Sequence, residues 1–257
     1  MIPEIFRISI FEDFSIPIFS FGLMMLLCFL GSMILLQSCL KEAGENPMLA
    51  EPMVTYAAIG GVIGARFFSI ISYPNQLMED PIGVIFSSAG FVFYGGFIGG
   101  FIAVFILLRK NKIPFLKFTN IVAAPLAFGY AIGRVGCQLS GDGDYGIESS
   151  LPWAMNYIYG VIPTASTVHP TPVYESLISL FLAIFLRSTF LKNKLRFDGQ
   201  LFGFYLIISG VSRYFIENLR VEPRVLSGFS QAQLISIPLI LIGIFLIFNK
   251  KASNVKA

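Results

Sequence analysis

Seven long apolar stretches constrain this chain more than any other feature of its sequence. An α-helix needs roughly 17–25 residues to cross a bilayer. The predicted spans are residues 17–39, 53–72, 89–108, 118–139, 172–190, 199–217 and 231–249. Only 13% of the residues are charged, against about 25% in soluble domains. We therefore expect an all-α integral membrane protein, with one polytopic membrane domain over residues 1–257.

Lysine and arginine are distributed unevenly between the connections. Connections on the side of the N-terminus hold three of them and those on the other side hold twelve. Because basic loops stay in the cytoplasm, the N-terminus is expected outside and the C-terminus in the cytoplasm. The longest connection, about residues 140–171, would then be an outward-facing cap between spans 4 and 5. The first 15 residues hold one basic residue, Arg7, so we expect no removable signal peptide.

The segment from Gly129 to Gly146 places Arg134 among glycines at the end of the fourth span and continues into a loop of glycines and carboxylates. A guanidinium at membrane depth costs roughly 2.5–3.5 kcal/mol on insertion scales, so it is kept where it has a polar partner. Glycines on either side allow a large molecule to approach the backbone. This combination predicts a pocket for an anionic, lipid-sized molecule.

Ionisable residues inside or at the edge of the spans support the same prediction. They are Arg66, Arg134, Glu175, Arg213 and Glu217. Arg213 and Glu217 are four residues apart and share a helix face. Three arginines against two carboxylates leave an excess of positive charge, and phosphate suits the planar guanidinium well. The alternative is a set of purely structural ion pairs. The net charge of +3 gives no reason to expect nucleic acid as a partner.

Glycines also recur at helical spacing. Gly60 and Gly64 indicate close helix packing through a small-residue face. The segment Tyr94–Gly100 holds four glycines in seven positions, which favours either the same packing or space for a lipid. Three cysteines lie within the predicted spans, without the spacing of a metal centre or of a disulfide.

Four blocks of the sequence resemble the motifs of the prolipoprotein diacylglyceryl transferase family, in the order that the family has them. Residues 133–142 resemble G-R-x-G-N-F-x-N-G-E and residues 169–175 resemble H-P-x-x-x-Y-E. Residues 213–220 resemble R-F-x-x-E-x-x-R and residues 94–99 resemble H-G-G-x-x-G. The seven spans and their orientation agree as well, so the resemblance covers nearly the whole chain.

The sequence departs from the family pattern at several motif positions. The replacements are Phe21 for a tyrosine, Tyr94 for a histidine often considered catalytic, Cys137 and Ser140 for two asparagines, and Asp142 for a glutamate. The loop between Asp142 and Gly146 is one residue longer than usual. The chain therefore resembles a diverged member of the family.

The resemblance implies transfer of a diacylglyceryl group from phosphatidylglycerol to a lipobox cysteine thiol of a prolipoprotein, in lipoprotein maturation. The thiol ordinarily has a pKa of about 8.5 and reacts as the thiolate. Preplaced cations stabilise a departing phosphate. We expect Arg134 and Arg213 to bind the phosphate, with Glu217 orienting Arg213.

Four side chains are candidates for activating the thiol or for contacting the headgroup. A tyrosine phenol titrates near pH 10 and is a poor base, so Tyr94 would bind the glycerol headgroup or require a nearby arginine. His169 is the only histidine, either catalytic or a structural residue at a helix start. Asp142 or Asp144 would act as base or headgroup acceptor, or would shape the glycine-rich turn.

The sequence also predicts further substrate-binding residues and a location, and it leaves alternative functions open. The predicted substrate-binding residues are Arg66, Gly95, Gly96, Gly99, Gly133, Gly136, Cys137, Ser140, Gly141, Asp144, Gly146 and Glu175. No metal or other cofactor is expected, and the sequence indicates no oligomeric state. The expected location is the bacterial cytoplasmic (inner) membrane, as a multi-pass protein. The alternatives are a diverged enzyme with another acceptor or lipid, and a non-enzymatic lipid-binding or transport protein.

Overall fold

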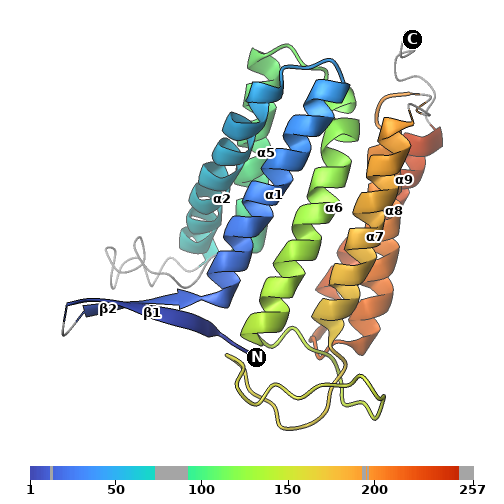
Figure 1. The fold of residues 1–257 in the computed structure, drawn as a ribbon. Coiled ribbons are helices and arrows are strands. Elements are labelled where there is room, and N and C mark those ends of the chain that lie inside the picture. Colours follow the sequence, from blue (N-terminus) through green and yellow to red (C-terminus); the bar gives the residue numbers. More distant parts are fainter. Residues whose placement is uncertain (12–13, 73–91, 193–194, 196, 249–257) are drawn as a thin grey trace. The chain divides into compact units, whose positions relative to one another are not determined.

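The computed structural model describes residues 1–11, 14–72, 92–192, 195 and 197–248, and within them the chain is mostly helical (Figure 1). Each long helix overlaps one predicted span. The helices are α1 (Ser20–Glu42), α2 (Ala50–Ser72), α5 (Phe93–Lys110), α6 (Phe115–Ser140), α7 (Thr171–Leu191), α8 (Gln200–Ile216) and α9 (Gln231–Phe248). The short 3-10 helices are η1 (Pro47–Leu49) and η2 (Glu217–Leu219). Residues 89–91, predicted to begin the third span, lie outside the described ranges.

Five helical segments of the described chain are long and apolar enough to cross a membrane. They are Ser20–Glu42, Pro47–Ser72, Phe115–Ser140, Thr171–Leu191 and Gln231–Phe248. Few of the residues in most of these segments are buried inside the protein. Apolar side chains that do not face protein are compatible with a lipid solvent, so these segments support an all-α membrane protein.

An N-terminal β-hairpin precedes the first helix and was absent from the sequence prediction. Strands β1 (Glu4–Phe11) and β2 (Phe14–Phe19) pair antiparallel, with Ile8 opposite Ile16. The predicted start of the first span at residue 17 is therefore wrong, because the chain is still extended until Phe19. A second pair, β3 (Arg224–Leu226) and β4 (Phe229–Ser230), lies between η2 and α9.

The described chain divides into two compact units, residues 1–36 with 119–257 and residues 37–118. In the first unit, α6, α7, α8 and α9 run side by side (Figure 1). Their core is built from small and branched side chains: Ala123, Ala124 and Ala127 of α6, Leu182, Ala183 and Leu186 of α7, and Leu201 of α8. Small side chains let helix backbones approach closely. This packing holds the three helices that carry the arginines and carboxylates described below.

In the second unit, α2 and α5 meet along a row of glycines, which we call the glycine seam: Gly60, Gly61, Gly64, Gly95, Gly96 and Gly99. A Cβ added to Gly60 would lie 2.7 Å from the carbonyl oxygen of Gly99. One added to Gly96 would lie 3.2 Å from the Gly61 carbonyl oxygen. The packing predicted for Gly60 and Gly64 is confirmed.

The glycine seam also includes three of the predicted substrate-binding residues, whose contact with substrate stays a prediction. Gly95, Gly96 and Gly99 were expected to contact substrate, but the space beside each of them is filled by α2. A Cβ on Gly95 would lie 2.5 Å from the Cβ of Phe68. Their lack of a side chain is used for helix packing.

Candidate active site

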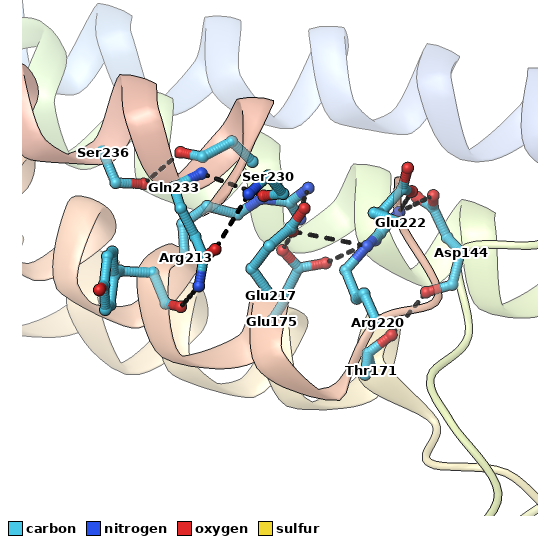
Figure 2. A network of polar contacts seen from close by, with 12 residues as sticks. Asp144, Thr171, Glu175, Arg213, Glu217, Arg220, Glu222, Ser230, Gln233 and Ser236 are labelled. Carbon is cyan, nitrogen blue, oxygen red and sulfur yellow. Dashed lines mark hydrogen bonds and ion pairs between the residues drawn. The ribbon is translucent and has the colours of Figure 1, made fainter. Parts of the chain in front are cut away.

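Arginines and carboxylates from six parts of the first unit converge on one cluster (Figure 2). Its members are Arg134 of α6, Asp144 of the loop after α6, Glu175 of α7, Arg213 of α8, Glu217 of η2, and Arg220 and Glu222 beyond η2. We call these seven residues the arginine cluster. Arg134 and Arg213, which were both expected to bind the phosphate, each contact Glu175.

Glu175 lies at the centre of the cluster with only 3% of its side chain exposed. Its Oε1 accepts hydrogen bonds from Arg213 Nη1 at 2.6 Å and from the Tyr130 hydroxyl at 2.9 Å. Its Oε2 lies 3.1 Å from Arg134 Nε. Buried carboxylates need such partners, because desolvation is costly for an unpaired charge. Glu175 thus contacts Arg134, Arg213 and Arg220, and its predicted contact with substrate stays a prediction.

Two further contacts set the direction of the arginines. Arg213 Nη2 lies 3.0 Å from Glu217 Oε2, which confirms the expected ion pair across one helical turn. The Arg134 guanidinium carbon lies 4.9 Å from the centre of the Tyr130 ring, in a cation–π arrangement. Tyr130 was not among the predicted site residues. Its position one turn before Arg134 on α6 was the available signal.

Arg220 and Glu222 were not among the predicted site residues either. Arg220 Nη2 donates to Asp144 Oδ1 at 2.5 Å and to Glu222 Oε1 at 2.8 Å. Asp144 also accepts a hydrogen bond from Arg134 Nη1. Asp144 thus bridges two arginines that are far apart in the sequence. The available signal for Arg220 was its place at the end of the R-F-x-x-E-x-x-R block. Residue 220 lies beyond the predicted span 199–217, so it was not counted among the ionisable residues of the spans.

The expected excess of positive charge is wrong for this cluster. The three guanidiniums of Arg134, Arg213 and Arg220 face four carboxylates, since Asp144 and Glu222 join Glu175 and Glu217. Both additional acids come from loops that follow helices, where the count of charges inside spans did not include them. The cluster therefore carries no excess positive charge that would attract an anion.

The two aspartates after α6 differ in their ionisation. Burial opposes the charge on Asp144, but hydrogen bonds and charge from Arg220 and Arg134 outweigh it and lower the pKa of Asp144 to about 2. Burial raises the pKa of Asp142, and the neighbouring charge of Asp144 raises it further. Asp142 makes no ion pair among the described residues. Asp144 is therefore a fixed anion, whereas Asp142 retains an affinity for a proton.

His169 is held by the loop rather than aimed at the cluster. Its backbone N–H donates to the Ile147 carbonyl at 3.1 Å, and its carbonyl accepts from the Gly146 N–H at 2.8 Å. Its ring Nδ1 lies 3.3 Å from the Tyr174 hydroxyl, which accepts a hydrogen bond from Trp153 Nε1. These contacts agree with the structural alternative for His169 at the start of α7.

Several residues predicted to contact substrate make packing contacts within the protein. Ser140 is buried and its hydroxyl donates to the Cys137 carbonyl at 3.2 Å. A Cβ on Gly136 would lie 3.1 Å from the Met24 Cβ, and one on Gly146 would lie 2.9 Å from the His169 Cβ. Gly141 has φ +61° and lies against Gly160, so it serves the turn after α6. The predicted substrate contacts at these four positions stay predictions.

Gly133 is the exception among the predicted glycines, because nothing lies within 4 Å of where its Cβ would be. It precedes Arg134 on α6, so the backbone there is open to a ligand. The pocket that the glycine-flanked motif predicted beside Arg134 stays a prediction.

Cys137 lies beside the two aspartates. Its Sγ and the carboxylates of Asp142 and Asp144 lie within 4.8 Å of one another, an arrangement that by residue type also suits a metal ion. Arg134 Nη1 lies 3.8 Å from the Cys137 Sγ and also binds Asp144. Two guanidiniums already neutralise Asp144, which disfavours a further cation there.

Tyr94 and Arg66 belong to the second unit, on α5 and α2. Tyr94 has 39% of its surface exposed. Their predicted contacts with the headgroup stay predictions.

Comparison with known proteins identifies the family of this chain. The family model for prolipoprotein diacylglyceryl transferase matches residues 8–249. A Clostridium tetani protein named phosphatidylglycerol–prolipoprotein diacylglyceryl transferase is 34% identical, over 93% of this chain and 96% of its own length. Proteins of the same name from Finegoldia magna and Clostridioides difficile are each 31% identical, over 96% and 95% of this chain and 97% and 96% of their own lengths. The chain belongs to the prolipoprotein diacylglyceryl transferase family.

Proposed function

We propose that the protein transfers the diacylglyceryl group of phosphatidylglycerol to the lipobox cysteine of a prolipoprotein, and that the arginine cluster is where the lipid phosphate binds. The observation that carries the proposal is the convergence of Arg134, Arg213 and Arg220 around the buried Glu175 in a member of this family. Guanidiniums held by carboxylates keep their direction before the substrate arrives, as electrostatic preorganisation requires.

The proposed transfer can be followed through the bonds that form and break. The cysteine thiol loses its proton, and the sulfur attacks the sn-3 carbon of the diacylglycerol unit, forming a thioether. The bond from that carbon to the phosphate oxygen breaks, and glycerol phosphate leaves with the bonding pair. Negative charge grows on the phosphate oxygens, where Arg134 and Arg213 donate hydrogen bonds.

Asp142 is the base that this chain offers for the thiol. Asp144 is committed to two arginines, and the His169 ring contacts the Tyr174 hydroxyl. Asp142 is only partly buried, and its raised pKa gives it a higher proton affinity than its paired neighbour. It also lies beside the Cys137 thiol, so a sulfur atom is already accommodated at this position.

The membrane arrangement is part of the same proposal. All seven predicted spans cross the bacterial cytoplasmic membrane as one domain, with the N-terminus outside and the C-terminus in the cytoplasm. The loop between α6 and α7 then forms an outward cap, and the cluster lies at the depth of outer-leaflet headgroups. The uneven distribution of lysine and arginine supports this orientation.

A transfer assay tests the function directly. The purified protein is mixed with phosphatidylglycerol and a lipobox peptide, and mass spectrometry follows the peptide. The expected result is a diacylglyceryl mass increment on cysteine, with release of glycerol phosphate. No increment at high enzyme concentration, while a relative from the same family is active in parallel, contradicts the proposal. Headgroup release without peptide modification would indicate another acceptor.

A further inference from the structure

Arg220 has unused capacity to bind an anion. Its side chain is 4% exposed, and only Nη2 donates hydrogen bonds, to Asp144 and Glu222. Nε and Nη1 are buried without a hydrogen-bond partner among the described residues. The nearest carboxylate oxygens recorded for them, on Glu217 and Glu175, each lie 3.8 Å away. A guanidinium has five N–H donors in a fork that matches phosphate.

The charge of the cluster opposes an additional anion. Three guanidiniums already face four carboxylates, and the phosphate of phosphatidylglycerol adds a further negative charge. Like charges at short distance in a partly buried site repel strongly. A lipid phosphate is therefore accommodated best when one carboxylate leaves.

Three of the four carboxylates are poor candidates to leave. Glu175 and Glu217 are 3% and 2% exposed, and each contacts more than one arginine. Asp144 bridges Arg134 and Arg220, and its carbonyl accepts a hydrogen bond from Thr171 Oγ1 at 2.5 Å. Moving any of them would leave buried guanidiniums unpaired, which is costly.

Glu222 differs from the others in exposure and in connections. Its side chain is 39% exposed, and Arg220 is the partner that the structure records for it within the described residues. It lies in the short segment between η2 and β3 rather than on a helix (Figure 2). Arg220 is 4% exposed, but the Glu222 side of this ion pair faces water, so Glu222 is the carboxylate that can be hydrated again most readily when it leaves.

We propose that Glu222 is a displaceable counter-ion of Arg220, which holds the guanidinium until the phosphate of phosphatidylglycerol replaces it. This inference rests on the proposed function and adds a residue that sets the apparent affinity for the lipid. Glu222 moves toward solvent when the lipid binds, and its position on Arg220 Nη2 is taken by a phosphate oxygen. Glu222 is a positioning residue, since it does not contact the reacting atoms.

The test compares lipid binding and turnover in the full-length protein in zwitterionic micelles. Retention of radiolabelled phosphatidylglycerol gives the dissociation constant, and the peptide assay gives kcat and KM. Glu222→Gln is expected to lower both the dissociation constant and KM by about twofold to fivefold, because the competing charge is removed. The kcat should stay within about twofold. Glu222→Asp should behave like the wild type.

Glu148→Gln is the matched control. Glu148 is an exposed carboxylate in the loop before α7, and it makes no side-chain contact with an arginine among the described residues. It should leave lipid retention unchanged. Unchanged or weaker retention in Glu222→Gln overturns the inference, as does equal tightening in Glu148→Gln, which would indicate a general surface-charge effect.

The two readouts also separate this inference from the proposed function. A wild-type protein that retains phosphatidylglycerol but modifies no peptide contradicts the proposed transfer, and retention alone then decides the role of Glu222. A wild-type protein that retains no phosphatidylglycerol overturns both.

Discussion

The glycine seam and the arginine cluster are both sites of close helix contact, but they are built from contrasting residues. Glycines form the seam, and charged side chains form the cluster. In the glycine seam, α2 and α5 approach through bare backbone, and the described contacts leave no room for another group. In the arginine cluster, Arg134 of α6, Arg213 of α8 and Arg220 beyond η2 surround the buried Glu175 of α7. The comparison teaches that the glycine repeat of α2 and α5 reports helix packing, whereas charged residues in and beside the spans gather at the proposed site.

The largest effect is expected from removing Glu175, the residue at the centre of the arginine cluster. Glu175→Ala leaves three buried or half-buried guanidiniums without their shared partner, so we expect the free energy of unfolding to fall by about 3–5 kcal/mol. Denaturant unfolding in detergent measures the loss. Glu148→Ala, an exposed glutamate, should change it little. A Glu175→Ala protein as stable as the wild type would show that the cluster contributes nothing to the fold.

Removing one arginine tests whether the arginine cluster acts in catalysis. Arg134→Ala should lower kcat about 100-fold or more while the protein still inserts, because a preplaced donor to the leaving phosphate is lost. The initial rate of diacylglyceryl transfer measures the effect. Arg109→Ala, at the exposed end of α5, is the matched control and should be near wild type. Wild-type rates in Arg134→Ala would contradict the phosphate assignment.

The two aspartates of the same loop sharpen the account of the base. A base must be deprotonated, so the wild-type rate should rise with pH through the raised pKa of Asp142. Asp142→Asn should lower the rate about 100-fold and remove that limb of the pH profile. Asp144 has a pKa of about 2 and stays ionised throughout the assay, so Asp144→Asn should keep the limb. The reverse pattern would assign the base to Asp144.

The smallest effect is expected in the glycine seam. A Cβ on Gly64 would lie 2.9 Å from the Gly99 Cα, so Gly64→Ala should cost about 1–3 kcal/mol of stability through overpacking. The apparent affinity for phosphatidylglycerol should not change. Gly22→Ala is the control, because its Cβ would meet nothing within 4 Å. A rise in the KM for phosphatidylglycerol in Gly64→Ala, at unchanged stability, would indicate instead that the glycine seam takes part in lipid binding.

Local sequence patterns predicted the helices and their nearest-neighbour contacts. Apolar length located all seven long helices, and spacing of four residues predicted the pairing of Arg213 with Glu217. The same spacing predicted the packing of Gly60 and Gly64. These features depend on residues close together in the chain, where helix geometry alone determines the contact.

Contacts between segments that are far apart in the sequence could not be predicted from local patterns. Asp144 and Arg220 are 76 residues apart, and only the packing of α6, α7 and α8 brings them together. The error in the charge balance followed from this, since Asp144 and Glu222 lie outside the helices that were counted. The N-terminal hairpin escaped prediction because no charged residue separates the apolar residues of β2 from those of α1.

A structure of the protein in phosphatidylglycerol nanodiscs tests the central claim most directly. The account predicts a lipid phosphate within hydrogen-bonding distance of Arg134 and Arg213, with Glu222 turned away from Arg220. A well-resolved map in which every guanidinium keeps its carboxylate partners, and no headgroup lies beside them, would contradict it.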